Sequence, residues 1–532
     1  MNPSIRWLAG AVGGHRRAFL STLAANLISQ LSLWGIALTC AWLVGHSSPL
    51  GGVLAVLVLI ATAATWWESY VAHDLAYLVL ARLRGEAFEA VARIAPARLL
   101  GRRSGDLSAV VLSDIETLEW LFAHTLAQLI TSFVVLTAGS VAALLINPWL
   151  LAVSLPLACL VLTVPLWLRR FSSAHGSAMR AATADLHADV VDTVQGLREI
   201  LAFGAVDRRR ALLADKTRRL ARAQAANAAR GGLEGALTDV LLSVASAATL
   251  AVVALTVSAP ADAPLAMVLA AGSLAPAAQV ALLLKEYGSL RAAADRVHTL
   301  VTAPANVTPA RQVRAEPGDV VFEDVRFRYT PEGPEVLKGV SFTIPQGRTV
   351  ALVGPSGAGK STCVSLLLRY WDPDGGRITI GGVPLAQASS LVTVVPQDVH
   401  LFAGTVADNV RLGAPSADVT GPLATAQLPI DPETVVGERG VALSGGQRAR
   451  VAIARALATE APVLVLDEAV ANLDTSTEER LAAALEVAAA GRTTLVIAHR
   501  PATIRRADHV VVLDDGRVVA QGTFAEVSHW LE

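Results

Sequence analysis

Long apolar runs occupy the first part of the chain and constrain its fold more than any other feature. Six runs are long enough to span a bilayer, which needs about 20 residues, and no such run occurs after about residue 304. They cover 19–45, 51–71, 121–146, 148–168, 233–257 and 265–284. Lipid offers the backbone no hydrogen-bond partners, so these runs predict transmembrane α-helices. The chain is therefore predicted to be a multi-pass membrane protein with a C-terminal part outside the membrane.

Basic residues set the predicted orientation of these spans. The connections 72–120 and 169–232 are long and rich in arginine, whereas 46–50, 147–148 and 258–264 are short and contain neither Lys nor Arg. Because positive charge favours the cytoplasmic side, we expect the two long connections and both termini to be cytoplasmic. Few turn signals interrupt the long connections, which favours helices that continue the spans into the cytosol.

Composition excludes several classes of protein. Hydrophobic residues make up 53% of the chain and charged residues 17%, whereas charged residues average about 25% in soluble proteins. A disordered chain is excluded. The net charge of -1 lacks the positive excess that is typical of proteins that bind nucleic acid. The three cysteines, Cys40, Cys159 and Cys363, form no CxxC pair, so neither a zinc site nor a disulfide framework is predicted. Membrane lipid is the partner that composition implies.

A second, α/β domain follows the membrane part. We expect a membrane domain over 1–303, a polar, proline-bearing linker over 304–317 and a cytosolic nucleotide-binding domain over 318–532. Residues 350–362, VALVGPSGAGKST, read as an apolar strand, a glycine loop and a helix start, and they match G-x-x-x-x-G-K-[ST]. Such a loop aims backbone N–H groups at phosphate oxygens. The predicted ATP-binding residues here are Gly354, Pro355, Ser356, Gly357, Ala358, Gly359, Lys360, Ser361 and Thr362.

Two side chains of this loop and a later acidic pair carry the predicted chemistry. Lys360 is expected to reach the β- and γ-phosphates and Ser361 to ligate Mg²⁺. Residues 463–468, VLVLDE, read as a buried strand that ends in two acids. Asp467 is predicted to hold Mg²⁺, and Glu468 to polarise the attacking water. ATP and Mg²⁺ are therefore the expected substrate and cofactor.

The motif LSGGQ at 443–447 resembles the signature of the ABC ATPase family. The resemblance implies that these residues bind the γ-phosphate of ATP held by a partner subunit, which fits a helix N-terminus that attracts anions. The signature residues are Leu443, Ser444, Gly445, Gly446 and Gln447.

Further elements of the ABC ATPase family occur in the expected order. The resemblance implies that Tyr329 stacks on adenine, that Gln397 contacts Mg²⁺ and the membrane domain, and that Asp474 belongs to the ATP site. It makes His499 a catalytic residue beside Glu468, and it matches 434–440, TVVGERG, to an exporter-specific loop. Gln397 and Ser444 are only 47 positions apart, which predicts a helical subdomain shortened by about one helix.

The resemblance to ABC exporters also implies the assembly and the mechanism. One chain with six predicted spans and one nucleotide domain is half of a transporter, so a second half must complete the ATP sites. Such a dimer would hydrolyse ATP and move a small-molecule solute out of the cytoplasm. A function of another class stays open: a membrane-held assembly scaffold that senses ATP without transport.

Within exporters, four segments of the membrane part are similar to the CydC family. They are 67–88, 102–122, 196–208 and 274–276. CydC-type proteins sit in the bacterial inner membrane, pair with a CydD-type subunit and support cytochrome bd assembly, with thiol compounds and haem both proposed as cargo. The resemblance therefore favours a CydD-like heterodimer over a homodimer. A peptide, siderophore or drug exporter is the competing interpretation.

Four residues of the membrane part are candidates for haem or cargo contacts. The family's haem-ligating histidine falls on His73, although Ser69 replaces the arginine usual four residues earlier. Glu68 is an ionisable residue in a predicted span and so a functional candidate. Pro276 and Gln279 interrupt the sixth apolar run and are candidates for lining a translocation path. The competing interpretation of His73 is a satisfied interfacial histidine beside a solvated helix extension, and Glu68 is a similar case. For Pro276 and Gln279 the competing interpretation is a helix packing contact.

Overall fold

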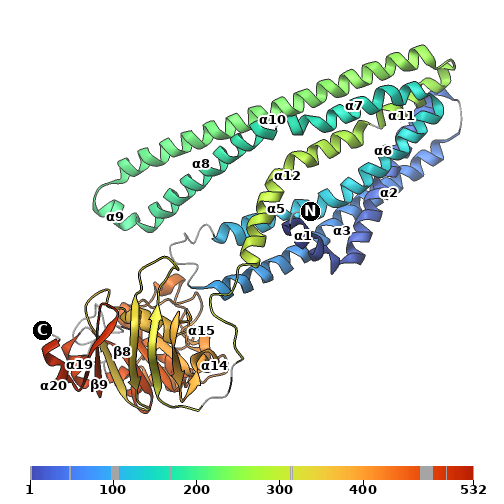
Figure 1. The fold of residues 1–532 in the computed structure, drawn as a ribbon. Helices are drawn as coiled ribbons and strands as arrows, with labels where there is room; N and C mark the ends of the chain where they lie inside the picture. The colour runs from blue at the N-terminus through green and yellow to red at the C-terminus, as the bar shows by residue number, and fades with distance from the viewer. Residues whose placement is uncertain are drawn as a thin grey trace. The chain divides into compact units, whose positions relative to one another are not determined.

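A computed structural model describes most of the chain as two compact units. The described residues are 3–46, 49–96, 107–167, 169–272, 274–311, 313, 316–467, 483–498 and 500–530. The first unit comprises 1–92 with 101–303, and the second comprises 93–100 with 304–532. The first is helical and the second is built on two β-sheets (Figure 1).

Long helices make up the membrane unit. In chain order they are α1 (Pro3–Gly13), α2 (Arg16–Gly45), α3 (Gly51–Ile94), the π-helical η2 (Ala109–Asp114), α5 (Ile115–Trp120), the π-helical η3 (Leu121–Thr125), α6 (Leu126–Ile146), α7 (Pro148–Trp167), α8 (Arg169–Gln195), α9 (Leu197–Ala202), α10 (Val206–Thr256), the 3₁₀ turn η4 (Pro260–Asp262), α11 (Ala263–Gly272) and α12 (Leu274–Val301).

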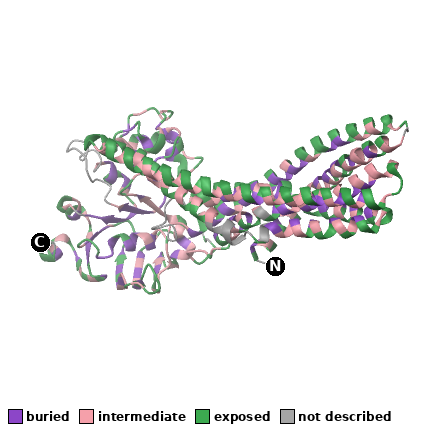
Figure 2. Cartoon of the chain, turned by 90° about the horizontal axis from the view of Figure 1, so that it is seen from above, coloured by how far each residue is buried: buried purple, intermediate pink, exposed green. Residues whose placement is uncertain are grey.

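Among the described residues, five helical stretches are long and apolar enough to cross a membrane. They are Arg16–Gly45, Gly51–Ile94, Ala109–Ile146, Val206–Thr256 and Pro260–Val301. The remaining predicted span, 148–168, lies in α7, whose apolar stretch Pro148–Val164 is shorter. Many large apolar side chains of these helices are exposed (Figure 2), such as Leu145 at 81% and Leu255 at 85%. Such faces suit a lipid environment rather than water.

The last predicted span, 265–284, falls within the helical stretch Pro260–Val301. Its described parts are α11 (Ala263–Gly272) and α12 (Leu274–Val301). Pro276 and Gln279, which interrupt the apolar run in the sequence, both lie in α12.

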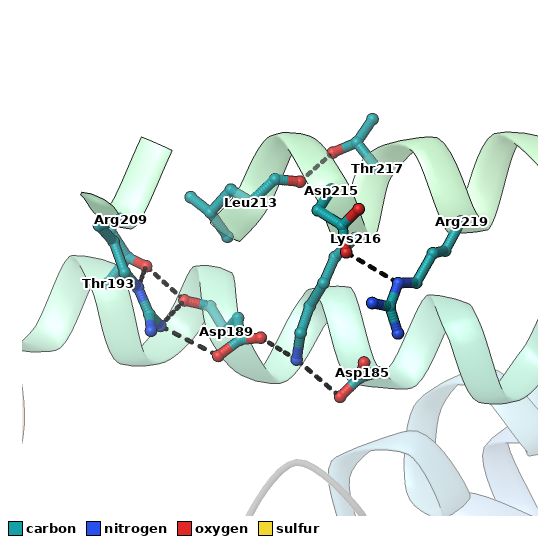
Figure 3. Close-up of polar contacts among 9 residues, drawn as sticks. All are labelled: Asp185, Asp189, Thr193, Arg209, Leu213, Asp215, Lys216, Thr217 and Arg219. Carbon is teal, nitrogen blue, oxygen red and sulfur yellow. Dashed lines mark hydrogen bonds and ion pairs between the residues drawn. The ribbon is translucent and has the colours of Figure 1, made fainter. Parts of the chain in front are cut away.

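The helices α8 and α10 lie side by side (Figure 1). Both include long parts outside the predicted membrane spans. An ion-pair ladder joins them (Figure 3): Lys216 Nζ binds Asp189 and lies 2.8 Å from Asp185 Oδ1. Arg209 donates to the Asp189 carbonyl oxygen at 2.7 Å and to Thr193 Oγ1 at 2.6 Å. The hydrogen bond from Lys216 lowers the pKa of Asp189 from its ordinary value. The ladder fixes the register of the two helices.

The second unit contains a four-stranded sheet in the order β2-β1-β4-β5 and a six-stranded sheet in the order β10-β9-β3-β8-β7-β6. The strands are β1 (Val320–Phe327), β2 (Leu337–Ile344), β3 (Thr349–Val353), β4 (Gly375–Ile380), β5 (Val383–Pro384), β6 (Val392–Val395), β7 (Val463–Asp467), β8 (Thr493–Ile497), β9 (His509–Asp514) and β10 (Arg517–Gly522). Within the larger sheet β9, β3, β8, β7 and β6 run parallel. Such strands are continuous apolar runs because both faces are covered; β8 is buried throughout.

Helices of the second unit pack around these sheets. They are α13 (Lys360–Leu367), α14 (Leu385–Ala388), α15 (Val406–Val410), α16 (Thr420–Thr425), α17 (Gly445–Ala458), α19 (Pro501–Arg506) and α20 (Phe524–Val527). All residues between Gln397 and Ser444 are described, and the α-helices among them, α15 and α16, have five and six residues. This region is therefore compact, as its length in the sequence implies.

Candidate nucleotide site and membrane-unit polar cluster

The predicted phosphate loop lies between β3 and α13. Gly354, Gly357 and Gly359 have φ values of 145°, 86° and 103°, in the region that favours glycine. A Cβ at Gly354 would lie 2.0 Å from the Leu513 carbonyl oxygen, and one at Gly359 would lie 2.6 Å from Leu337 Cδ2. Gly354 and Gly359 are therefore required both by the backbone turn and by close packing, and Gly357 by the turn alone.

Lys360 begins α13 and folds back over the loop. Its side chain is buried at 6% exposure, and Nζ donates to the carbonyl oxygens of Gly354 at 2.8 Å and Pro355 at 2.9 Å. A buried ammonium held by carbonyl oxygens lies where the loop wraps an anion. Ser361, the predicted Mg²⁺ ligand, follows it and is exposed.

An aromatic pair lies beside α13. The Tyr329 hydroxyl shares a hydrogen bond of 2.9 Å with Thr362 Oγ1. Its ring meets that of Trp371 edge to face, with centroids 5.3 Å apart. Tyr329 remains 44% exposed, so a planar base could stack there. The sequence did not predict a role for Trp371 beside Tyr329. The one signal for it was its position shortly after α13.

The order of the parallel strands gathers the remaining predicted residues at one edge of the sheet. β3, β8, β7 and β6 are adjacent and parallel, so their carboxyl ends meet at the edge where ligands bind in open α/β sheets. The phosphate loop follows β3, Asp467 ends β7, and exposed Gln397 follows β6 by two positions. Their hydroxyl, carboxylate and amide oxygens are of the types that Mg²⁺ prefers, and the magnesium site at Ser361, Asp467 and Gln397 stays a prediction.

Three predicted residues of this site, Glu468, Asp474 and His499, lie outside the described residues. In the sequence, Glu468 follows β7 directly and His499 comes two positions after β8.

The signature residues form the start of α17. Ser444 is its N-cap: Oγ accepts from the Gln447 backbone N–H at 3.3 Å, and the Ser444 N–H donates to Gln447 Oε1 at 2.8 Å. This reciprocal capping box satisfies two groups of the helix end. Ser444 and Gly445 are exposed, while Leu443 and Gly446 are buried. The motif therefore forms a capped helix N-terminus with Ser444 and Gly445 at the surface, a geometry that attracts anions.

The membrane unit contains a polar cluster that includes two predicted residues. Asn26 Nδ2 donates to Glu68 Oε1 and, at 3.1 Å, to Gln128 Oε1. Gln128 Nε2 in turn donates to Gln279 Oε1 at 2.6 Å and to Ser132 Oγ at 3.3 Å. The four residues Asn26, Glu68, Gln128 and Gln279, called the amide chain below, come from α2, α3, α6 and α12. Sequence reasoning missed Asn26 and Gln128, although polar residues inside predicted spans were a usable signal.

His73 makes its hydrogen bond and its ring contacts with residues outside the amide chain. Its Nδ1 is 2.8 Å from the Ser69 carbonyl oxygen, and its ring is edge-on to that of His124, with centroids 5.3 Å apart. Where the chain is described, no group of three or more His, Cys, Asp or Glu side chains could hold a metal ion. Pro276 is buried and, like Gln279, lines a cavity between helices.

One chain carries both candidate membrane-spanning helices and an α/β domain with a phosphate loop. This combination defines a membrane-embedded ATPase with the architecture of a half-transporter. Family models agree: the ABC transporter transmembrane region matches residues 18–271, and the ABC transporter ATPase family matches 337–471. The chain belongs to the ABC transporter family, and it combines an exporter-type membrane domain with an ABC ATPase domain.

Individual relatives cover different shares of the chain. It is 30% identical over 540 residues to the glutathione/L-cysteine transport system ATP-binding/permease protein CydC of Escherichia coli strain K12, covering 96% of this chain and 92% of that protein. It is 45% identical over 255 residues to the ATP-dependent lipid A-core flippase of Cupriavidus pinatubonensis, covering 44% of this chain and 43% of the flippase. The match therefore spans less than half of that flippase's length. A bacterial Atm1-family ABC exporter with ATP bound has a similar structure, with a TM-score of 0.82, 26% identity, and coverage of 98% of this chain and 96% of that one.

Proposed function

We propose that this chain is the ATP-hydrolysing half of a dimeric ABC exporter that moves a solute out of the cytoplasm. The observation that carries the proposal is the buried Lys360 ammonium folded over a glycine loop, on a chain that also carries long apolar helices. Ser361, Asp467 and Gln397 would hold Mg²⁺, which neutralises charge on the phosphates. Glu468 would orient the water, and His499 would contact the γ-phosphate.

The proposed assembly is a pair of half-transporters. The exposed N-terminus of α17 supports a role in which Ser444 contacts ATP bound to the other half. A CydD-like subunit is the favoured partner because the CydC similarity covers nearly the whole chain, and a second copy of the same chain is the alternative. We place the protein in the bacterial inner membrane with the ATPase domain and both termini in the cytoplasm.

The proposed cargo is a thiol compound such as the glutathione or L-cysteine in the name of the Escherichia coli relative. Haem held by His73 is a less favoured cargo, because the His73 ring lies against Tyr77 and His124 and has Ser69 one turn before it. A lipid, as in the name of the flippase relative, and a peptide, siderophore or drug compete with these two cargoes.

The test measures ATP turnover and solute movement together. The full-length chain, alone and with a CydD-like subunit, is placed in proteoliposomes with the ATPase domains outside. We expect ATP-dependent uptake of labelled glutathione or L-cysteine. Glu468→Gln should reduce turnover by about 100-fold or more, as expected for loss of a general base. Glu486→Gln makes the same change in an exposed ion pair with Arg506 and should leave turnover within about twofold.

Two contrary outcomes have a definite meaning. Unchanged turnover in Glu468→Gln would remove its catalytic role. ATP turnover without movement of any solute would favour the assembly scaffold over the exporter.

A further inference from the structure

We infer that the membrane unit binds a neutral peptide carbonyl of its cargo through the side-chain amide N–H of Gln279. The inference rests on the proposed export function and gives its cargo a chemical class: a small solute that contains peptide bonds. It follows from the direction of the amide chain and from the cavity at which that chain ends.

The cavity lies between α2, α6, α11 and α12. Its volume is about 370 Å³, and most of its wall is apolar. Its polar side chains are Gln30, Trp34 and Gln279, and none of the described residues that line it carries a charge. A free carboxylate or ammonium group would lack a counter-charge here, and burying an unpaired charge is costly. A neutral polar group is the better match.

Glu68 sets the direction of the amide chain. The Glu68 carboxyl oxygen Oε1 accepts a hydrogen bond from the Asn26 Nδ2 group, so the Asn26 amide turns its nitrogen toward Glu68. The same Nδ2 group donates to Gln128 Oε1 at 3.1 Å. The oxygen and nitrogen of an amide group lie on opposite sides. Because Gln128 Oε1 faces Asn26, Gln128 Nε2 faces away from Asn26, and it donates to Gln279 Oε1 at 2.6 Å.

Gln279 therefore ends the amide chain with its Nε2 group outward. Its oxygen is occupied by Gln128, and the described residues provide no acceptor for Nε2. Gln279 is exposed and lines the cavity. The indole N–H of Trp34, another lining residue, is buried and has no hydrogen-bond partner in the described part of the chain. Two donors, Gln279 Nε2 and the Trp34 indole N–H, are therefore left over at this wall, and the Gln30 amide beside them offers both a donor and an acceptor. Hydrogen bonds in series strengthen one another.

A peptide carbonyl supplies what this wall lacks: an uncharged acceptor attached to a compact, partly apolar body. A purely structural cluster would hold helices together through the same bonds, but its members would be enclosed. The exposure of Gln279 at a cavity distinguishes the two interpretations. Glutathione contains two peptide bonds, whereas L-cysteine contains none.

The test compares two probes whose carboxylates are masked. Glutathione diethyl ester keeps the peptide carbonyls, and L-cysteine ethyl ester has none. Binding of each to the full-length chain in lipid nanodiscs, alone and paired with a CydD-like subunit, is measured by isothermal titration calorimetry. We expect the glutathione ester to bind at least about tenfold more tightly, since one additional hydrogen bond can account for such a factor.

Two variants ask whether the Gln279 donor is responsible. Gln279→Met keeps the side-chain volume but removes the donor, and it should weaken binding of the glutathione ester about tenfold. Glu68→Gln replaces the carboxyl group that accepts from Asn26 with an amide that can either donate or accept, so the amide chain loses its fixed direction and binding should weaken by about two- to fivefold. Gln224→Met makes the same change at an exposed site on α10 and should bind like the wild type. Gel filtration checks that each variant is folded.

Three results would overturn the inference: no binding of the glutathione ester by the wild type, equal binding of both probes, or wild-type affinity in Gln279→Met. ATP turnover is measured on the same samples. ATP turnover without probe binding would remove this binding site and leave the proposed function standing. Probe binding without ATP turnover in the paired complex would keep the binding site and remove the proposed ATP-hydrolysing function.

Discussion

The phosphate loop and the amide chain are both sites of polar recognition, but they are assembled from different sequence distances. Lys360 bonds to carbonyl groups five and six positions away. The bonds of the amide chain join residues 42, 102 and 151 positions apart. The first site is a local backbone structure, and the second exists only after four helices have packed.

The two sites also differ in what holds their polar groups. The loop depends on glycines with positive φ, so its strength comes from backbone geometry. The amide chain depends on side-chain bonds, and polar bonds between membrane helices contribute only about 0.6 kcal/mol on average. A single change should therefore damage the loop much more than the amide chain.

The largest expected effect is the loss of ATP turnover in Lys360→Ala. Removing the buried ammonium at the loop takes away charge stabilisation of the transferred phosphoryl group, which should lower turnover by about 100-fold or more. The control is Lys338→Ala, which breaks the 2.6 Å ion pair with exposed Asp515 and should change turnover by less than about twofold. A phosphate-release assay gives both values, and similar losses in both variants would contradict a special role for Lys360.

Gly359→Ala should have the next largest effect, on stability. The added methyl group meets Leu337 Cδ2 at 2.6 Å while the backbone stays at φ 103°, so the cost should reach about 3 kcal/mol. Gly382→Ala is the matched control, since Gly382 has φ 78° but an added methyl group would meet no described heavy atom within 4 Å. It should cost about 1 kcal/mol. Thermal unfolding without added nucleotide compares the two, and equal losses would mean that the contact with Leu337 is not restrictive.

The smallest effect is expected for Asn26→Leu in the amide chain. Leucine replaces the amide with an apolar group of similar size and removes its bonds to Glu68 and Gln128. We expect a loss of about 0.6 to 1 kcal/mol. Gln224→Leu, at an exposed position of α10, serves as the reference in the same unfolding assay. A loss in Asn26→Leu as large as that of Gly359→Ala would show that the amide chain is a main support of the membrane unit.

These differences explain which parts of the molecule could be predicted from the sequence. The phosphate loop, the strand before it and the helix after it are contiguous in the chain. The sequence pattern at 350–362 therefore predicted all three elements. The apolar runs predicted membrane helices because lipid leaves the backbone no other choice. Asn26 and Gln128 could not be paired with Glu68 and Gln279, since nothing in a single sequence indicates which faces of distant helices meet.

The capping box of α17 has a consequence for how an encounter with a second subunit would proceed. Ser444 and Gln447 satisfy each other's backbone groups within one chain, so this helix start is ordered before any partner arrives. Segments that become ordered only on contact lose conformational entropy and weaken association. A surface that is rigid in advance loses little, and the serine hydroxyl, which uses its lone pair for the cap, keeps its own proton to donate outward. Recognition at this surface can then be fast and repeatable, as a cycle of closing and reopening requires.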